Sequence, residues 1–247
     1  MSAPLSSVTR FVLVKPSHAG NVGAAARAIK VMGFADLVLV APRYDDVLSH
    51  DEALAMASGA TDVLAGARVV PALADALDGI VHVCATAMTP RDFGPPTAAP
   101  REHFAQLIQS GHGAPPNIAF VFGGERFGLA NDDVYRCHQC LSIPAAPAYG
   151  SLNLAQAVQL IAYEWRLALG GYDVTPRTPA PALADAQAVQ GLLDHWCEAL
   201  VALGYLDPAV PKKLMPRLNQ ALNRARVTDE EVHILRGIAR AIKAGRD

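Results

Sequence analysis

The residues best suited to chemistry lie where apolar segments of the chain give way abruptly to glycine and polar residues. The apolar run 117–122 is followed by GGERFG at residues 123–128. Adjacent glycines let a main chain approach a ligand closely, so this loop is a candidate for cofactor binding through backbone groups. Its spacing matches that of a phosphate-binding loop, but Leu129 and Ala130 replace the required lysine and hydroxyl. Nucleoside triphosphate chemistry is therefore disfavoured.

Three other loops directly follow the strand-like segments 11–14, 80–84 and 140–143. Ligands of open parallel sheets bind at the carboxyl edge, so we expect all four loops to face one another. Glycine-rich loops of this kind are also common as plain tight turns. If they bind a ligand, an adenine and its ribose could be bracketed by the backbone groups of Thr86, Gly123, Ile143 and Ser151.

Cysteine and acidic residues give weaker signals. Cys137 and Cys140 form a C-x-x-C with His138 between them, which is a motif of metal and redox sites. A zinc site needs four ligands, and no second cysteine pair is present, so we expect reduced, structural thiols and no metal. The sequence also contains no G-x-S-x-G and no carboxylate cluster, which disfavours covalent hydrolysis and metal catalysis.

The elements that must position the loops alternate between strand and helix. This alternation predicts an α/β fold with a mostly parallel sheet and helices on both faces. We expect Asn21 to cap the first helix, Gly33 to end it, and Ser151 to cap a long helix reaching Leu169. The proline-rich stretch 89–100 is expected to be a mobile loop. Strands are expected at 11–14, 37–41, 68–70, 80–84, 117–122 and 140–143.

Composition changes after residue 170. Gly, Pro and Thr dominate residues 171–182, which is typical of a linker. Residues 183–247 have helical periodicity and no strand signal. We therefore predict a catalytic domain at 1–170, a linker at 171–182 and a small all-helical extension at 183–247.

Overall composition limits the class of protein. The chain has 247 residues, of which 51% are hydrophobic and 18% charged, so a disordered chain is excluded. No apolar stretch of about 18 residues lacks a charge or a turn former, so no membrane partner is expected. The first ten residues contain no basic segment followed by an apolar run. We therefore expect a cytoplasmic protein.

Three stretches together resemble a known family. They are NVGAAAR at 21–27, FGGERFGL at 122–129, and IP at 143–144 followed by SLNLAQA at 151–157. Their order and spacing are similar to the three motifs of the SPOUT-superfamily RNA 2′-O-ribose methyltransferases. Within that superfamily, the chain resembles the TrmJ branch of the TrmH group. The C-terminal residues 223–226 and 231–238 resemble the helical extension of that branch, so the resemblance covers nearly the whole chain.

The resemblance implies properties that periodicity does not reveal. These are S-adenosylmethionine as methyl donor, a C-terminal trefoil knot in the sheet, a homodimer, and a tRNA substrate methylated on the ribose of nucleotide 32 in the anticodon loop. Similar enzymes more often have Ser, Ala and Ser where Ala87, Met88 and Gly150 stand. The cofactor-binding positions implied are Thr86, Ala87, Met88, Gly123, Ile143, Gly150, Ser151 and Leu152.

The resemblance also makes Arg27 the main catalytic candidate, with Asn21 and Ser151 beside it. The pKa of an arginine exceeds about 12, so a role as general base is unfavourable. We predict that Arg27 clamps the phosphate next to the target ribose, and that this phosphate could take the proton. Asn21 is equally suited to a plain N-cap. For Arg27 the alternative is an arginine on a solvated helix face, and the resemblance favours the catalytic role. His18 is not included among the catalytic residues. The transferred methyl group is already activated, so no metal is required.

Charge and loop position suggest where RNA would bind. The net charge of -2 conceals about +4 over residues 205–247 and about -6 over residues 1–204. The basic tail could hold an RNA backbone, although some of its charges would suit a solvated helix face. The candidate RNA contacts, besides Arg27, are Arg91, Glu125, Arg126, Lys212 and Lys213.

Other functions remain open at this stage. One is a non-catalytic RNA-binding relative that keeps the fold, which the presence of Arg27, Glu125 and Asn153 disfavours. Another is a ribose methyltransferase that acts on a different RNA. A nucleotide-dependent enzyme of ordinary doubly wound fold is disfavoured because the phosphate-binding fingerprints are absent.

Overall fold

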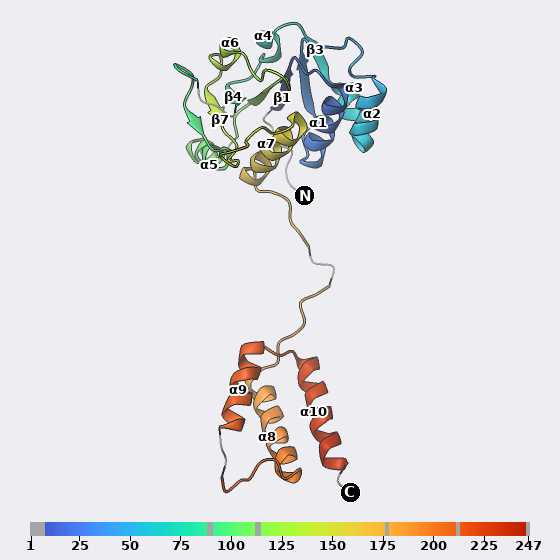
Figure 1. Cartoon of the computed structure of the whole chain (residues 1–247), viewed down its shortest axis with the longest axis vertical. Helices are drawn as coiled ribbons and strands as arrows, with labels where there is room; N and C mark the ends of the chain where they lie inside the picture. Colours follow the sequence, from blue (N-terminus) through green and yellow to red (C-terminus); the bar gives the residue numbers. More distant parts are fainter. Residues whose placement is uncertain (1–7, 88–90, 112–114, 176–177, 211–212, 246–247) are drawn as a thin grey trace. The chain divides into compact units, whose positions relative to one another are not determined.

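The computed structural model describes residues 8–87, 91–111, 115–175, 178–210 and 213–245. The chain divides into two compact units, Met1–Asp173 and Val174–Asp247, which are drawn in Figure 1. Among the described residues, no helix has both the length and the apolar character needed to cross a bilayer.

The first unit is built on a seven-stranded sheet in the order β3-β2-β1-β6-β4-β7-β5. Every neighbouring pair of these strands is parallel, which confirms the predicted α/β class. The strands are β1 (Thr9–Val14), β2 (Asp36–Val40), β3 (Arg68–Val70), β4 (His82–Thr86), β5 (Thr97–Ala98), β6 (Ile118–Gly123) and β7 (Gln139–Leu141).

Strand β5 corrects the expectation that 89–100 is a loop throughout. Its two residues pair with β7 at the edge of the sheet. A strand of two residues is too short to show an alternation of apolar and polar side chains. Pro95 and Pro96, which directly precede it, favour a loop over a strand. Residues 88–90 of the same stretch lie outside the described residues.

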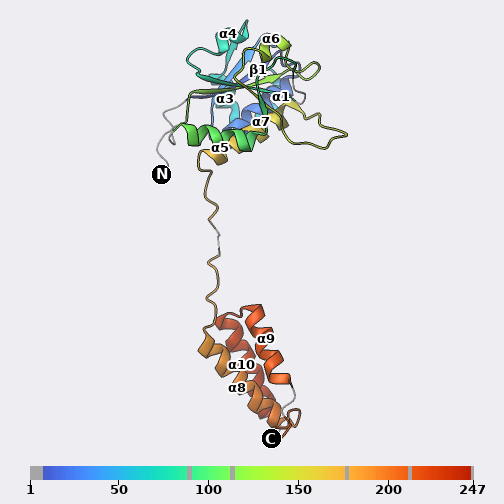
Figure 2. The same cartoon turned by 90° about the vertical axis from the view of Figure 1, so that its left-hand side faces the viewer.

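Helices cover both faces of the sheet, as predicted (Figures 1 and 2). One core lies under α1, α2, α3, α5 and α7 and includes Phe11, Phe120 and Trp165. The other core lies under α4 and α6 and includes Val12, Val121 and Val134. Helices of this unit are α1 (Ala19–Val31), α2 (Asp51–Ala57), η1 (Ser58–Ala60), α3 (Thr61–Gly66), α4 (Leu73–Ala76), α5 (Pro100–Ser110), α6 (Asn131–Val134) and α7 (Leu154–Ala168).

Trp165 anchors α7 to the middle of the sheet. Its side chain is fully buried and meets the rings of Phe104 and Phe120 edge-on. The indole Nε1 donates to Thr9 Oγ1 at 3.1 Å, so its one polar atom has a partner. This packing fixes α7, whose amino end carries the third motif.

Two predicted helix starts are wrong. Helix α1 is capped at His18, so Asn21 lies inside its first turn. Helix α7 is capped by Asn153, whose side chain accepts from the Ala155 N–H at 2.9 Å, and not by Ser151. Asn and Ser are both good caps, so residue type alone does not choose between neighbouring candidates. At Asn21, the side chain binds groups from other segments and cannot serve the helix end.

The second unit is a bundle of α8 (Ala186–Ala202), α9 (Leu214–Ala225) and α10 (Asp229–Ala244). Its own core contains Val189, Leu192 and Val232, so the predicted all-helical extension is confirmed. Helices α9 and α10 are separate because Arg226 adopts a left-handed conformation that ends α9, and Thr228 then caps α10. The trefoil knot is not decided by strand order and stays a prediction.

Close packing between α1 and α2 generates a test at Gly23. A side chain there would overlap the backbone carbonyl of Ala53, which cannot move aside as a flexible side chain could. We expect Gly23→Ala to reduce the free energy of unfolding by about 1–3 kcal/mol, measured by calorimetry of the first unit's transition. Gly66→Ala is the matched control, because a Cβ at that position would meet no other atom within 4 Å. Equal stability of the two variants would contradict this packing account.

Candidate active site

A cavity of about 320 Å³ opens at the carboxyl ends of β4 and β6. This volume lies within the usual range of small-molecule sites. Met88 lies outside the described residues, and the other predicted cofactor positions all line the cavity. These are Thr86, Ala87, Gly123, Ile143, Gly150, Ser151 and Leu152.

The cavity offers polar groups to a bound molecule. Thr86 Oγ1 is buried and has no hydrogen-bond partner among the described residues. A buried polar group is normally paired, so the Thr86 hydroxyl is suited to a hydrogen bond with a bound ligand. A nucleoside-containing cofactor fits this requirement.

The glycines after β6 have a different role from the one that the sequence suggests. A Cβ at Gly123 would overlap the backbone of Gly128, and one at Gly124 would overlap the Lys15 carbonyl. The loop closes on itself through the Gly128 N–H, which donates to the Gly124 carbonyl at 2.9 Å. These glycines are therefore required by the loop's own packing as well as by any close approach of a ligand.

Glu125 joins the predicted motifs. Its Oε2 accepts from the Ser17 backbone N–H at 2.8 Å and from Ser17 Oγ at 2.7 Å. Its Oε1 accepts from Asn21 Nδ2 at 2.7 Å. Asn21 Oδ1 in turn accepts from Asn153 Nδ2 at 2.9 Å. One chain of hydrogen bonds thus connects the loop after β6, the start of α1 and the start of α7.

The charge of Glu125 follows from this network. Burial alone would raise its pKa, but hydrogen bonds from Asn21 and Ser17 outweigh burial and lower the pKa to about 2. The carboxylate is therefore ionised at neutral pH and holds no proton to donate. Because both oxygens are already bound by protein donors, the geometry favours a positioning role for Glu125 over the expected direct contact with RNA.

Ser17 is a site residue that sequence reasoning missed. It directly precedes His18, whose Nδ1 lies 3.5 Å from Glu125 Oε1. The sequence feature that could have identified Ser17 is its position in a polar turn just after β1, at the edge of the sheet where ligands bind. Serine is so common in turns that this signal did not separate a partner of Glu125 from an ordinary turn residue.

The predicted cationic residues are divided between the cavity and the surrounding surface. Arg91 and Arg126 line the cavity together with Glu125. Arg27 is exposed on α1, does not line the cavity, and makes no hydrogen bond or ion pair with any described residue. Of the predicted C-terminal contacts, Lys213 is exposed, whereas Lys212 lies outside the described residues.

The C-x-x-C thiols are buried within the first unit. Burial raises the pKa of Cys137 to about 12, and its Sγ donates to the Asp133 carbonyl at 3.3 Å. Burial also raises the pKa of Cys140. Protonated, buried thiols are poor nucleophiles, so this pair is structural in character.

Two family matches cover the two units. Residues 9–163 match the SpoU rRNA Methylase family. Residues 187–247 match the C-terminal domain of the tRNA methyltransferase TrmJ.

Individual proteins agree with these matches. The tRNA (cytidine/uridine-2′-O-)-methyltransferase TrmJ of Cronobacter sakazakii is 40% identical over 245 residues, which cover 96% of this chain and 97% of that protein. The crystal structure of TrmJ from Z. mobilis ZM4 has a TM-score of 0.79 and 33% identity, covering 96% of this chain and 100% of that one. A probable methyltransferase from Bordetella pertussis Tohama I is 48% identical, with a TM-score of 0.60, over 66% of this chain and 96% of that one.

The Glu125 network predicts a pH-dependent stability. Replacing Glu125 by Gln turns an N–H group toward existing donors, so the free energy of unfolding should fall by about 1–3 kcal/mol at neutral pH. The folded-state pKa of about 2 lies below the ordinary value of 4.5, so the wild-type carboxylate stabilises the fold above pH 4.5. This contribution is lost as the pH falls from 4.5 toward 2.

Calorimetry of wild type and Glu125→Gln across this pH range provides the measurement. The stability difference should shrink as the pH falls. Exposed Glu102→Gln is the control and should change stability by less than about 0.5 kcal/mol. A difference that stays constant from neutral pH to about pH 3 would rule out an ionised, hydrogen-bonded Glu125.

Proposed function

The chain belongs to the SpoU methylase family and ends in a TrmJ-type domain, and from this premise we propose that it methylates the 2′-hydroxyl of cytidine or uridine ribose in tRNA. The observation that carries the proposal is the cavity at the carboxyl edge, which residues of the second and third motifs line. Hydrogen bonds of Asn21 with Glu125 and Asn153 connect the first motif to the other two. As a finer proposal, the target is nucleotide 32 of the anticodon loop, which rests on the resemblance to the TrmJ branch. Activity on tRNA implies a cytoplasmic protein.

We propose S-adenosylmethionine as the methyl donor. When bound, its sulfonium supplies a methyl group that is already activated, so the reaction needs no metal. The residue whose buried hydroxyl has no partner among the described residues, Thr86, is proposed to hold it, together with the lining residues Gly123, Ile143, Gly150, Ser151 and Leu152. The protein must then orient the ribose hydroxyl for in-line attack and provide for the release of its proton.

Arg27 is proposed to clamp the phosphate beside the target ribose. Its guanidinium is exposed, and an arginine can hold a phosphate through two parallel hydrogen bonds. Arg91 and Arg126 line the cavity and are proposed to contact the RNA backbone there.

The position of Arg27 bears on assembly. It does not line the cavity of its own chain. We propose a homodimer in which Arg27 of one copy serves the cavity of the other. In a two-fold dimer, each copy would then complete the site of its partner by the same contact.

The second unit is proposed to bind the tRNA backbone. Lys213, Arg217, Arg224 and Arg226 are all exposed, and the segment from 205 to 247 carries a net charge of about +4. The description of the first unit's family names rRNA, but the TrmJ-type domain of the second unit favours tRNA as the substrate. A non-catalytic RNA-binding relative is disfavoured because the cavity and the Glu125 network are both intact.

Substitution of Arg27 tests the catalytic proposal. Arg27→Ala should lower the rate of methyl transfer to unmodified tRNA by at least about 100-fold, since it removes a charged contact to the substrate. Donor affinity, measured by calorimetry, should change by less than about twofold because Arg27 lies outside the cavity. Lys30→Ala, one turn further along α1, is the control and should retain activity. Ribose mapping that finds full methylation with Arg27→Ala would remove this residue from the mechanism.

Mixing two inactive variants tests the shared site. Leu152→Trp fills the cavity, and Arg27→Ala lacks the clamp. If Arg27 acts across a dimer, equal amounts of the two variants should recover about a quarter of wild-type activity, because half of the dimers then contain one complete site. If Arg27 acts within its own chain, the mixture should stay inactive.

Neutralising Lys212 and Lys213 tests the role of the second unit. The Lys212→Gln/Lys213→Gln variant should bind tRNA more weakly, and the slope of log affinity against log salt should decrease by about two. Donor binding should be unchanged. Lys243→Gln is the matched control, because that ammonium is already paired with Glu198 at 2.9 Å. An unchanged salt slope would show that the two lysines lie on a solvated face.

A further inference from the structure

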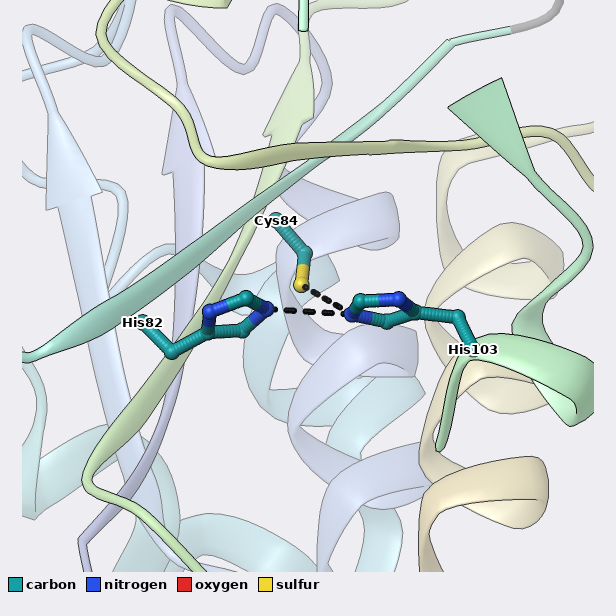
Figure 3. Close-up of side chains that lie close together, drawn as sticks. All are labelled: His82, Cys84 and His103. Carbon is teal, nitrogen blue, oxygen red and sulfur yellow. Dashed lines mark hydrogen bonds between the residues drawn. The ribbon is translucent and has the colours of Figure 1, made fainter. Parts of the chain in front are cut away.

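A second cluster of chemically capable side chains lies at the opposite end of β4 from the cavity. His82 and Cys84 are two residues apart on this strand and point to the same face. His103 reaches them from α5. Figure 3 shows the two imidazole rings and the sulfur converging on one point. Cys84 is fully buried, and the two histidines are partly buried.

The spacing of the three ligand atoms suits one metal ion. His82 Nε2 and His103 Nε2 are 3.0 Å apart, and Cys84 Sγ is 3.9 Å from His103 Nε2. All three atoms lie within 4.8 Å of one another. In a tetrahedral zinc site, with Zn–N near 2.05 Å and Zn–S near 2.3 Å, ligand atoms are separated by about 3.3 Å for two nitrogens and about 3.6 Å for nitrogen and sulfur. The N–N distance and the Sγ–His103 distance each differ from these values by about 0.3 Å, and the Sγ–His82 distance stays within 4.8 Å.

Neighbouring groups fix the rings in place. The ring of His138 stacks on His82 with centroids 5.5 Å apart, and its Nδ1 accepts from the Val83 N–H at 3.0 Å. The ring of His103 stacks on His82 with centroids 5.2 Å apart. Ligands held by packing and hydrogen bonds need little reorganisation to bind an ion.

We propose that His82, Cys84 and His103 form a zinc-binding site. Two imidazoles and one thiolate match the ligand preference of zinc and disfavour magnesium or calcium, which require oxygen ligands. A water molecule would complete the tetrahedron. On binding, the Cys84 thiol loses its proton to solvent and the sulfur becomes a thiolate ligand. Because β4 ends at the methyl-transfer cavity, the ion would fasten α5 to the strand that carries Thr86.

This proposal departs from the expectation, drawn from the sequence, that the chain binds no metal. Closely spaced cysteines are the usual sequence signal of a zinc site, and Cys137 and Cys140 are the only such pair in the chain. The proposed ligands come from two elements about twenty positions apart along the chain, and only the packing of α5 on the sheet brings them together.

Cobalt substitution is the direct test. The full-length protein, stripped with a chelator, is titrated with Co²⁺, and the thiolate-to-cobalt charge-transfer band is recorded. Wild type should bind about one equivalent, and Zn²⁺ should displace the cobalt while Mg²⁺ should not. Cys84→Ser and His103→Gln should each lose the band and weaken zinc binding by at least about 100-fold, since even outer-shell changes cost 10–100-fold.

Matched controls distinguish a specific metal site from non-specific cobalt binding by other thiols and imidazoles. Cys197→Ser and His195→Gln change the same residue types on α8 of the second unit and should leave both the band and the stoichiometry unchanged. Circular dichroism and donor binding check that each variant is folded. The proposal is overturned if wild type shows no charge-transfer band, or if folded Cys84→Ser and His103→Gln bind cobalt as wild type does.

Discussion

The carboxylate of Glu125 is the interaction on which the candidate site depends. It accepts three hydrogen bonds from Ser17 and Asn21, and Asn21 passes the connection on to Asn153. Hydrogen bonds to an ionised group are stronger than neutral ones, and those that are shielded from water are strongest. Three segments that are distant in sequence are therefore linked, two of them directly at this charge and the third through Asn21. Without it, the loop after β6 and the amino ends of α1 and α7 would lose their common anchor.

The sheet makes this convergence achievable. Strands β1 and β6 are parallel neighbours in register, with Val14 opposite Gly123, so their following loops start at the same level. Gly124 then passes close to the Lys15 carbonyl, where no side chain could fit. The two cores and the buried Trp165 fix the helices that approach this edge. The geometry of the cavity is thus a consequence of strand register and close backbone packing.

The two ends of β4 carry different sets of chemically capable residues, and the two units of the chain differ in charge. The carboxyl end of β4 contributes Thr86 to the cavity, while its amino end carries the histidine and cysteine cluster. The second unit has a separate core and a net positive segment. A methyltransferase that acts on a large RNA needs a small-molecule site and a cationic surface, and we propose that the first unit's cavity and the second unit's basic segment serve these two needs.

Local signals in the chain are enough to predict the alternating α/β pattern, the helical second unit, the positions of the cavity loops and the family. Each of these depends on apolar runs, glycine positions or motif order. These features are visible in the sequence without knowledge of which helices and strands pack together. Only the folded chain reveals that Asn21 binds Glu125 and Asn153 instead of capping α1, that Ser17 belongs to the site, and that His103 meets His82 and Cys84. The reason is physical: a polar side chain of one type suits a cap, a turn or a ligand set equally well. Which role it takes depends on the partners that strand pairing and helix packing bring within about 3 Å of it.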